Sequence, residues 1–190
     1  MQSTDRRALL GKLALAATTA LASRANAFAD PPRCALTSED IEGPYFLPGA
    51  PTRTLLIEPG MQGSVLELEG VLRDSACRVV ANARVELWQC DALGRYDTRG
   101  TRLRTRIQTD SRGRWAVRTI VPGRYLNGDT YRPAHIHLKL HGPRGVLTTQ
   151  MYFEGDPYNA SDPWYRRERA VSLIENGREF RARFDAVVRR

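Results

Sequence analysis

Two of the three histidines in this 190-residue chain, His135 and His137, are separated by a single residue. They begin an apolar stretch, residues 135–140, that is typical of a β-strand. Side chains two residues apart on a strand share a face, so both imidazoles can enter one site. Neutral imidazole is a common metal ligand, and the spacing therefore indicates a metal site. The alternative is a pair of ordinary polar residues on a half-buried strand, and the remaining ligands must decide between the two interpretations.

Two tyrosines are expected to lie near the same region. Tyr96 closely follows a predicted strand, residues 83–88, and Tyr125 closely precedes the two histidines. Both are loop positions, and both loops lead toward the strand that carries the histidines.

Six short motifs occur in order along most of the chain that follows the first 40 residues. They are Glu42–Phe46, Leu87–Tyr96, Thr109–Trp115, Ile120–Tyr125, Arg132–His137 and Leu147–Gln150. In this order they resemble the intradiol ring-cleavage dioxygenases, the family that includes catechol 1,2-dioxygenases and protocatechuate 3,4-dioxygenases. A chance match to one such motif is easy, but a match to six in register is not.

The resemblance implies a non-haem Fe(III) centre whose ligands are Tyr96, Tyr125, His135 and His137. Phenolate is a hard, anionic oxygen ligand that favours ferric iron, and the metal must lower a tyrosine pKa that is ordinarily near 10. Two phenolates and two neutral imidazoles leave a net positive centre, which attracts a catecholate dianion. The implied reaction uses O2 to cleave a catechol-type ring between its two hydroxylated carbons, giving a muconate-type dicarboxylic acid.

Further roles follow from the same resemblance. Arg132 matches the family's active-site arginine, and a fixed guanidinium is suited to stabilising negative charge that develops on a substrate ring. Tyr125 matches the tyrosine that leaves the metal and takes up a proton when substrate binds. The implied substrate-binding residues are Gly43, Pro44, Tyr45 and Gln150.

Other metal chemistries fit the histidine pair less well. The cupin pattern requires a Glu soon after His-x-His, and the ferrous facial triad requires a nearby carboxylate, but Leu138–Gly142 supplies neither. His141 shares strand parity with His135 and His137, so a three-histidine zinc site is a further alternative. A secreted β-sandwich binding module without catalysis is the main alternative from another functional class.

The loop between Tyr125 and Arg132 is shorter than in the catechol enzymes of the family. It contains a second tyrosine, Tyr131, that could replace Tyr125 as the ligand. The Pro-Gly-Arg-Tyr context favours Tyr125.

The N-terminus predicts export. Arg6 and Arg7 precede an apolar stretch, Leu13–Ala22, that is too short to span a bilayer, so residues 1–29 are interpreted as a cleaved signal. The paired arginines resemble a twin-arginine signal, and an ordinary secretory signal is the alternative. Cleavage is expected after Ala25–Ala27 or Ala27–Ala29. The domain of residues 30–190 would then be periplasmic or extracellular, without stable membrane insertion.

The charge of the chain indicates its partners only weakly. The formal net charge is +8, of which the predicted signal contributes +3 and leaves +5 on the domain. The basic residues are spread along the chain, and no basic helix or aromatic motif predicts nucleic-acid binding. The expected partners are a catechol-type substrate and O2, and a homo-oligomer is allowed.

The fold class is predicted to be all-β, a sandwich of mainly antiparallel strands with short helical turns and long active-site loops. A final hairpin is expected to pair residues 170–174 with 180–188, and short helical turns are expected near residues 38–40 and 162–165. After export, one disulfide is expected among Cys34, Cys77 and Cys90, with one thiol left over and the pairing open. The predicted strands are residues 64–72, 83–88, 114–118, 135–140 and 146–151.

Overall fold

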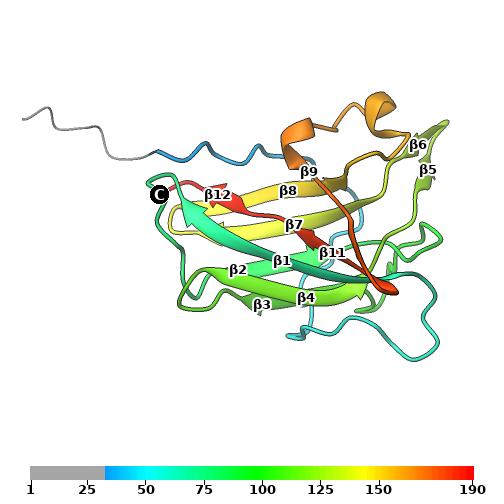
Figure 1. Cartoon of the computed structure of the whole chain (residues 1–190), viewed down its shortest axis with the longest axis horizontal. Helices are drawn as coiled ribbons and strands as arrows, with labels where there is room; N and C mark the ends of the chain where they lie inside the picture. Colours follow the sequence, from blue (N-terminus) through cyan, green and yellow to red (C-terminus); the bar gives the residue numbers. More distant parts are fainter. Residues whose placement is uncertain (1–32) are drawn as a thin grey trace, which may run out of the picture. The chain divides into compact units, whose positions relative to one another are not determined.

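The computed structural model describes residues 33–190, so the predicted export signal lies outside the described residues. This part of the chain consists of β-strands and two short 3₁₀ helices (Figure 1). The strands are β1 (Val65–Asp74), β2 (Arg84–Trp88), β3 (Arg104–Gln108), β4 (Arg114–Ile120), β5 (Tyr125–Asn127), β6 (Thr130–Arg132), β7 (His135–Gly142), β8 (Gly145–Phe153), β9 (Ala170–Val171), β10 (Ile174–Asn176), β11 (Glu179–Arg183) and β12 (Ala186–Val188). The 3₁₀ helices are η1 (Asn159–Ser161) and η2 (Arg167–Arg169). In the described part of the chain, none of the helices has the length and apolar character needed to cross a membrane.

Two mixed sheets pack face to face. One has the order β10-β11-β1-β12, with β4 also paired to β1, and the other has the order β3-β2-β7-β8-β9. Most neighbouring strands are antiparallel, but β1 runs parallel to β11 and β12. Apolar side chains from both sheets, such as Leu68 of β1 and Leu138 of β7, form one core. The predicted β-sandwich is confirmed.

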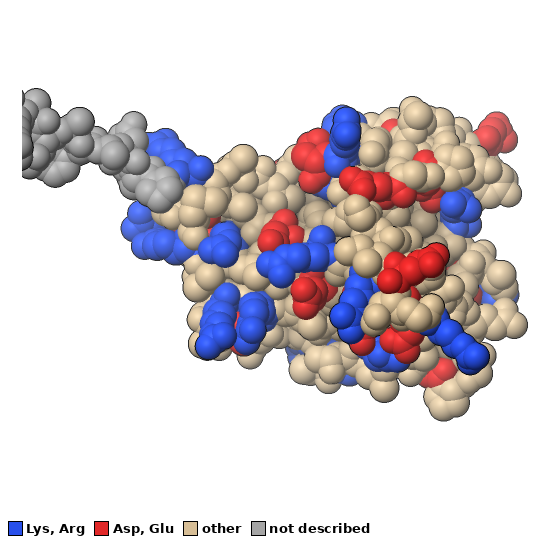
Figure 2. Space-filling model, in the orientation of Figure 1, with Lys and Arg blue, Asp and Glu red and all other residues tan. Residues whose placement is uncertain are grey.

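The alternation of β1 shows why these residues form a half-buried strand. Leu66 and Leu68 point into the core, while Glu67 and Glu69 point outward. Each glutamate faces an arginine of β11, with Glu67 paired to Arg181. Exposed ion pairs of this kind contribute little stability, so burial of the leucines dominates. Figure 2 shows acidic and basic side chains interspersed over much of one face.

The strand that carries the histidines, β7, lies between β2 and β8 in the second sheet. Its residues Ile136, Leu138 and Leu140 belong to the core between the sheets. His135 and His137 point to the opposite face of the sheet by alternation, yet both are buried. The rings of Tyr96 and Tyr125 pack on the two imidazoles from this side. Residues 34–46, called the strap below, run along β8 and bring Gly43 against His137.

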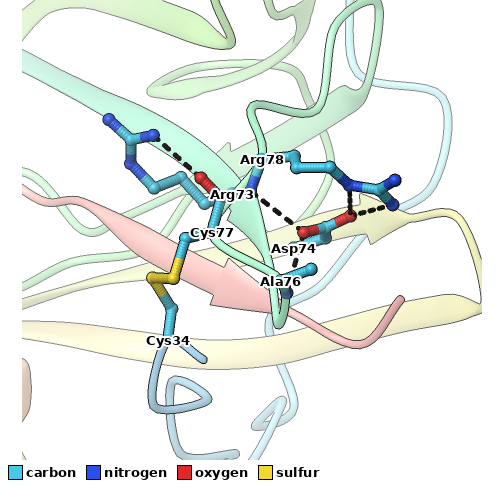
Figure 3. Close-up of a disulfide and its surroundings, with 6 residues drawn as sticks. All are labelled: Cys34, Arg73, Asp74, Ala76, Cys77 and Arg78. Carbon is cyan, nitrogen blue, oxygen red and sulfur yellow. Dashed lines mark hydrogen bonds and ion pairs between the residues drawn. A yellow bond between two sulfur atoms is a disulfide. The ribbon is translucent and has the colours of Figure 1, made fainter. Parts of the chain in front are cut away.

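Hydrogen bonds hold the strap against β8. The amide of Asp40 donates to the carbonyl of Thr148 at 2.9 Å, and the Gln150 side chain donates to the carbonyl of Ile41 at 2.8 Å. A disulfide joins Cys34, at the start of the strap, to Cys77 in the turn after β1 (Figure 3). Cys90 is a buried free thiol. The prediction of one disulfide and one remaining thiol is confirmed, and the structure supplies the pairing.

Two local predictions are wrong. Residues 38–40 are not a helical turn, because the Asp40 amide and the Ser38 carbonyl form hydrogen bonds with β8 instead of within a turn. The C-terminal hairpin is tighter than expected, since β10 pairs with β11 around Gly177. The residues expected to extend it belong elsewhere, with β9 parallel to β8 and β12 parallel to β1. The helical turn expected at 162–165 is a hydrogen-bonded turn directly after η1.

Candidate metal centre

The two imidazoles of β7 meet one phenol. The Nε2 atom of His135 lies 3.3 Å from the Tyr96 hydroxyl, and the Nε2 atom of His137 lies 3.1 Å from it. The Nδ1 atom of His135 lies 2.7 Å from the carbonyl of Pro133, so that nitrogen carries the proton and Nε2 has a free lone pair. The Nδ1 atom of His137 finds no hydrogen-bond partner among residues 33–190.

This arrangement fits a bound metal ion. The Tyr96 hydroxyl has one proton, so it can donate to only one of the two Nε2 atoms at a time. If Nε2 of His137 instead carries a proton and donates to the hydroxyl, the buried Nδ1 of His137 is left without a donor. Either tautomer leaves a buried nitrogen unsatisfied, which is costly, whereas a metal ion could be bound by both Nε2 atoms and the hydroxyl oxygen together. In the described part of the chain, no group of three or more His, Cys, Asp or Glu side chains could hold a metal. The neighbours of the imidazole pair are tyrosines, and this oxygen and nitrogen set suits ferric iron.

Burial sets the protonation of these groups. It lowers the pKa of His135 to about 3 and that of His137 well below the usual value, with the positive charge of Arg132 adding to both effects. Burial also raises the pKa of Tyr96 well above 10. In the absence of metal, the imidazoles are therefore neutral and the phenol is protonated at neutral pH. Neutral imidazole is the form that binds metals.

Tyr125 adds a second phenol to the cluster. Its ring stands edge-on to that of Tyr96, with centroids 5.5 Å apart, and lies 5.6 Å from that of His135. Tyr131 lies elsewhere, because it is 46% exposed and stacks on Tyr158. The structure thus brings Tyr125, rather than Tyr131, to the imidazole pair.

Two packed loops hold the tyrosines in place. The carboxylate of Asp91 accepts hydrogen bonds from the amides of Leu93 and Arg95, which closes the turn that leads to Tyr96. Gly94 has a φ of +77°, and a Cβ there would lie 2.3 Å from the carbonyl of Arg124. Only glycine allows the two loops to approach this closely. The signal for this turn in the sequence is Asp-Ala-Leu-Gly, which lies within the Leu87–Tyr96 motif.

Arg132 is buried beside the cluster and is directly opposite Tyr125 in the β5–β6 hairpin. Its Nε donates to Asp162 at 2.7 Å, and its Nη2 donates to Gln150 at 2.9 Å and to the Tyr152 hydroxyl at 3.1 Å. Burial opposes its charge, but the hydrogen bond to Asp162, together with the electrostatic effects of Tyr125, Tyr152 and Asp162, outweighs this and raises the pKa of Arg132.

The other residues expected to bind substrate lie close by. Tyr45 of the strap stacks on Tyr96, with ring centroids 4.1 Å apart and planes 11° apart. The α-carbon of Gly43 lies over His137, because an added Cβ would be 3.4 Å from Cε1 of that ring. Pro44 is exposed, whereas Gln150 is buried and bonds both Arg132 and the strap.

His141 does not join the cluster. Its Nε2 lies 2.9 Å from Glu86, and its Nδ1 faces Arg84. The three-histidine zinc alternative is therefore not favoured, since this imidazole is engaged near the far end of β7. Sequence reasoning missed four polar residues whose side chains are buried, Asp162, Tyr152, Asp40 and Arg169. Asp162 and Tyr152 bond Arg132, and Asp40 joins Tyr152 to Arg169.

Comparison with known proteins identifies the family. A family model described as Dioxygenase matches residues 41–181. The chain belongs to the intradiol dioxygenase family. The resemblance inferred from the six motifs is confirmed.

Two curated relatives illustrate the range of this family. Catechol 1,2-dioxygenase from Pseudomonas sp. (strain EST1001) is 33% identical over 150 residues, which cover 66% of this chain and 50% of the relative. Protocatechuate 3,4-dioxygenase beta chain from Burkholderia cepacia is 35% identical over 153 residues, which cover 67% of this chain and 65% of the relative. The chain therefore spans about half to two thirds of the length of these curated relatives.

Two solved dioxygenase structures have the same fold. The dioxygenase domain of a dioxygenase carbohydrate-binding protein fusion from Streptomyces sp. SirexAA-E superposes with a TM-score of 0.76 at 35% identity, covering 82% of this chain and 99% of that one. The 3-chlorocatechol 1,2-dioxygenase from Rhodococcus opacus 1CP has a TM-score of 0.74 at 30% identity, covering 80% and 71% respectively.

Proposed function

We propose that this protein is a non-haem iron dioxygenase that uses O2 to cleave a catechol-type ring between its two hydroxylated carbons. The product would be a muconate-type dicarboxylic acid. The observation that carries the proposal is the convergence of two buried Nε2 atoms, from His135 and His137, on the Tyr96 hydroxyl. Membership of the intradiol dioxygenase family and the names of the relatives support the same chemistry.

Tyr96, Tyr125, His135 and His137 would hold the metal, whose oxygen and nitrogen ligands suit Fe(III). When bound, ferric iron would supply a positive centre that both catechol oxygens can chelate and that makes the aromatic ring reactive toward O2.

Tyr125 is the residue we assign to proton uptake. Burial raises the pKa of Tyr125, while the adjacent Arg132 guanidinium opposes that rise. Its Oη would accept a proton from a catechol hydroxyl as the substrate enters. Tyr96 is held by its turn and by the stacked ring of Tyr45, so it would stay in place during this exchange.

The strap and Arg132 would shape the substrate site. Gly43 and Tyr45 cover His137 and Tyr96, which would limit water around the reacting ring. The buried guanidinium of Arg132 would stabilise negative charge on the substrate, because a preorganised cation in a dry site acts strongly on developing charge. Gln150 would act by holding Arg132 and the strap together.

We also propose that the domain acts outside the cytoplasm, as an exported periplasmic or extracellular enzyme. The disulfide between Cys34 and Cys77 supports this, because such bonds persist in oxidising compartments. The predicted signal at residues 1–29 is consistent with it.

Oxygen uptake by the Fe(III)-loaded protein tests the activity. We expect stoichiometric consumption of O2 with at least one of catechol, hydroxyquinol and protocatechuate, together with a dicarboxylic acid product in mass spectrometry. Tyr96→Phe should lose this activity, since it removes the oxygen on which both imidazoles converge. A protein that binds catechols but consumes no O2 would instead be a binding module, and the proposal would fail.

A further inference from the structure

A buried carboxylate, Asp162, holds the guanidinium of Arg132. Asp162 lies in the turn after η1, thirty residues beyond Arg132 in the sequence. The two side chains are 1% and 4% exposed, and Nε of Arg132 donates to Oδ2 of Asp162 at 2.7 Å. This is a fully buried ion pair formed between segments that are distant in the sequence.

The carboxylate is itself fixed by its turn. Oδ1 of Asp162 accepts hydrogen bonds from the amides of Trp164 at 2.8 Å and Tyr165 at 3.1 Å. With Oδ2 bound to Arg132, both oxygens have donors. Asp162 therefore cannot rotate without losing charge-assisted hydrogen bonds, which are stronger than those between neutral groups.

The other sides of the guanidinium are also held. The Trp164 ring lies 4.5 Å from Cζ of Arg132, and Nη2 donates to Gln150 and Tyr152. Gln150 and Tyr152 are the β8 residues directly opposite His137 and His135. The contacts of Arg132 thus connect the 162–164 turn to the strand pair that carries the imidazoles.

Stability alone does not account for this pair. Burying two charges costs about as much as their attraction returns, and well-packed apolar residues often stabilise a core equally well. The pair does fix the location of one positive charge, the Arg132 guanidinium. This location matters because Arg132 lies directly opposite Tyr125 in the β5–β6 hairpin. Small errors in the position of a catalytic group are expensive, up to about 100-fold in rate for a shift of about 1 Å.

We propose that Asp162 is a positioning residue that fixes the Arg132 guanidinium beside Tyr125, and that turnover depends on it although it does not contact the substrate. The inference rests on the proposed dioxygenase function, because it assigns Arg132 to the reacting site.

A double-mutant cycle tests this role. In the Fe(III)-loaded enzyme, Asp162→Asn should lower kcat by about 10- to 100-fold with little change in KM, because the guanidinium is displaced. In an Arg132→Gln background, the same substitution should change kcat by less than about 3-fold, because there is no guanidinium left to position. Equal losses of kcat in both backgrounds would overturn the inference.

Asp74 provides a matched control. Its Oδ1 accepts from the amides of Ala76 and Arg78, and its Oδ2 accepts from the Arg78 guanidinium, so it repeats the bonding of Asp162 in the turn that carries Cys77 (Figure 3). Asp74→Asn should lower stability but leave kcat within about 2-fold of wild type, since this turn does not border the metal centre. A loss of kcat like that of Asp162→Asn would show that general destabilisation is responsible, and the inference would fail.

A second readout needs no iron. In the metal-free protein, the Nε–H resonance of Arg132, assigned by its loss in Arg132→Lys, should exchange slowly with solvent. Exchange should accelerate by about 10-fold or more in Asp162→Asn, as expected when a charged hydrogen bond is lost. Unchanged exchange would overturn the positioning role. An inactive wild-type enzyme would instead overturn the proposed function, so the two failures are distinguishable.

Discussion

Two buried polar groups lie next to the strap, and the second includes Asp40 of the strap itself. They differ in how their hydrogen bonds are satisfied. In the first, the imidazole cluster of Tyr96, His135 and His137, two imidazole nitrogens share one hydroxyl, and Nδ1 of His137 has no partner among the described residues. In the second, the ion-pair network, each charge has an opposite partner. The network consists of Asp40, Gln150, Tyr152, Arg132, Asp162 and Arg169.

This difference indicates that the imidazole cluster binds a ligand, whereas the ion-pair network supports the structure around it. The cluster has an unsatisfied buried nitrogen, so it would gain stability from a bound metal ion. Such an ion could be bound by the Tyr96 hydroxyl oxygen and by Nε2 of His135 and of His137. A network whose charges are paired gains nothing from an added ligand but keeps its members in one arrangement. The comparison predicts that changes in the cluster abolish metal-dependent function, whereas changes in the network alter stability or geometry.

The largest effect is expected from removing an imidazole of the cluster. His137→Ala should lower catechol cleavage by more than the roughly 100-fold that is typical of changes outside the ligand shell. The matched control is His141→Ala on the same strand, where the imidazole pairs with Glu86. Steady-state oxygen uptake should show wild-type rates for this control. Equal losses in the two variants would contradict the assignment of the site.

Breaking the network should cost stability instead. Asp40 and Arg169 form a buried ion pair whose side chains are 0% and 2% exposed. Asp40→Asn leaves the guanidinium of Arg169 without its opposite charge, so the free energy of unfolding should fall by about 3–5 kcal/mol. Urea unfolding at neutral pH with the disulfide intact measures this. A change below about 1 kcal/mol would show that the network does not support the fold.

The Asp91 turn, which leads to Tyr96 of the imidazole cluster, should make stability depend on pH. Burial acts to raise the pKa of Asp91, but hydrogen bonds from Arg95 and Leu93 outweigh it and leave the pKa below the usual 3.8. Because the folded-state pKa is depressed, this stability is present above pH 3.8 and is lost as the pH falls through the folded-state value. Asp91→Asn should therefore cost about 1–3 kcal/mol at pH 7 and progressively less in strong acid. Urea unfolding at several pH values measures the difference in free energy of unfolding between wild type and Asp91→Asn. A difference that does not change with pH would contradict this prediction.

The smallest effect is expected at Tyr131. This ring stacks on Tyr158 and is nearly half exposed, so Tyr131→Phe should leave catechol cleavage within about 2-fold of wild type. Tyr125→Phe should reduce it strongly, because Tyr125 is the phenol beside Tyr96 and His135. The reverse ranking in parallel kinetic assays would make Tyr131 the ligand.

Local patterns predicted much of the fold. The alternating and apolar stretches became β1, β2, β4, β7 and β8, with bounds shifted by no more than two residues. β3 was missed because its sequence, Arg104–Gln108, is mostly polar. Arg104 reads as a surface charge but is buried, with its guanidinium donating to the carbonyl of Tyr45 at 3.2 Å. A hydrogen bond to a residue distant in the sequence leaves no periodic pattern in the strand, so the sequence could not predict that Arg104 is buried.

The site shows the same limit. Strand parity was enough to place His135 and His137 together, and the motifs added Tyr96 and Tyr125. Neither could indicate Asp162, because its relation to Arg132 depends on how the η1 turn folds back over the β5–β6 hairpin. Partners fixed by tertiary packing, rather than by spacing along the chain, became visible only in the structure.

Ferric iron titration of the metal-free protein tests the central claim most directly. We predict that one Fe(III) binds per chain, that a visible tyrosinate-to-iron charge-transfer band appears, and that Tyr125→Phe changes this band. Tyr96→Phe should weaken binding, because it removes the oxygen shared by both imidazoles. A protein that stays colourless with iron, or whose iron binding and colour are the same in wild type and Tyr96→Phe, would contradict the account.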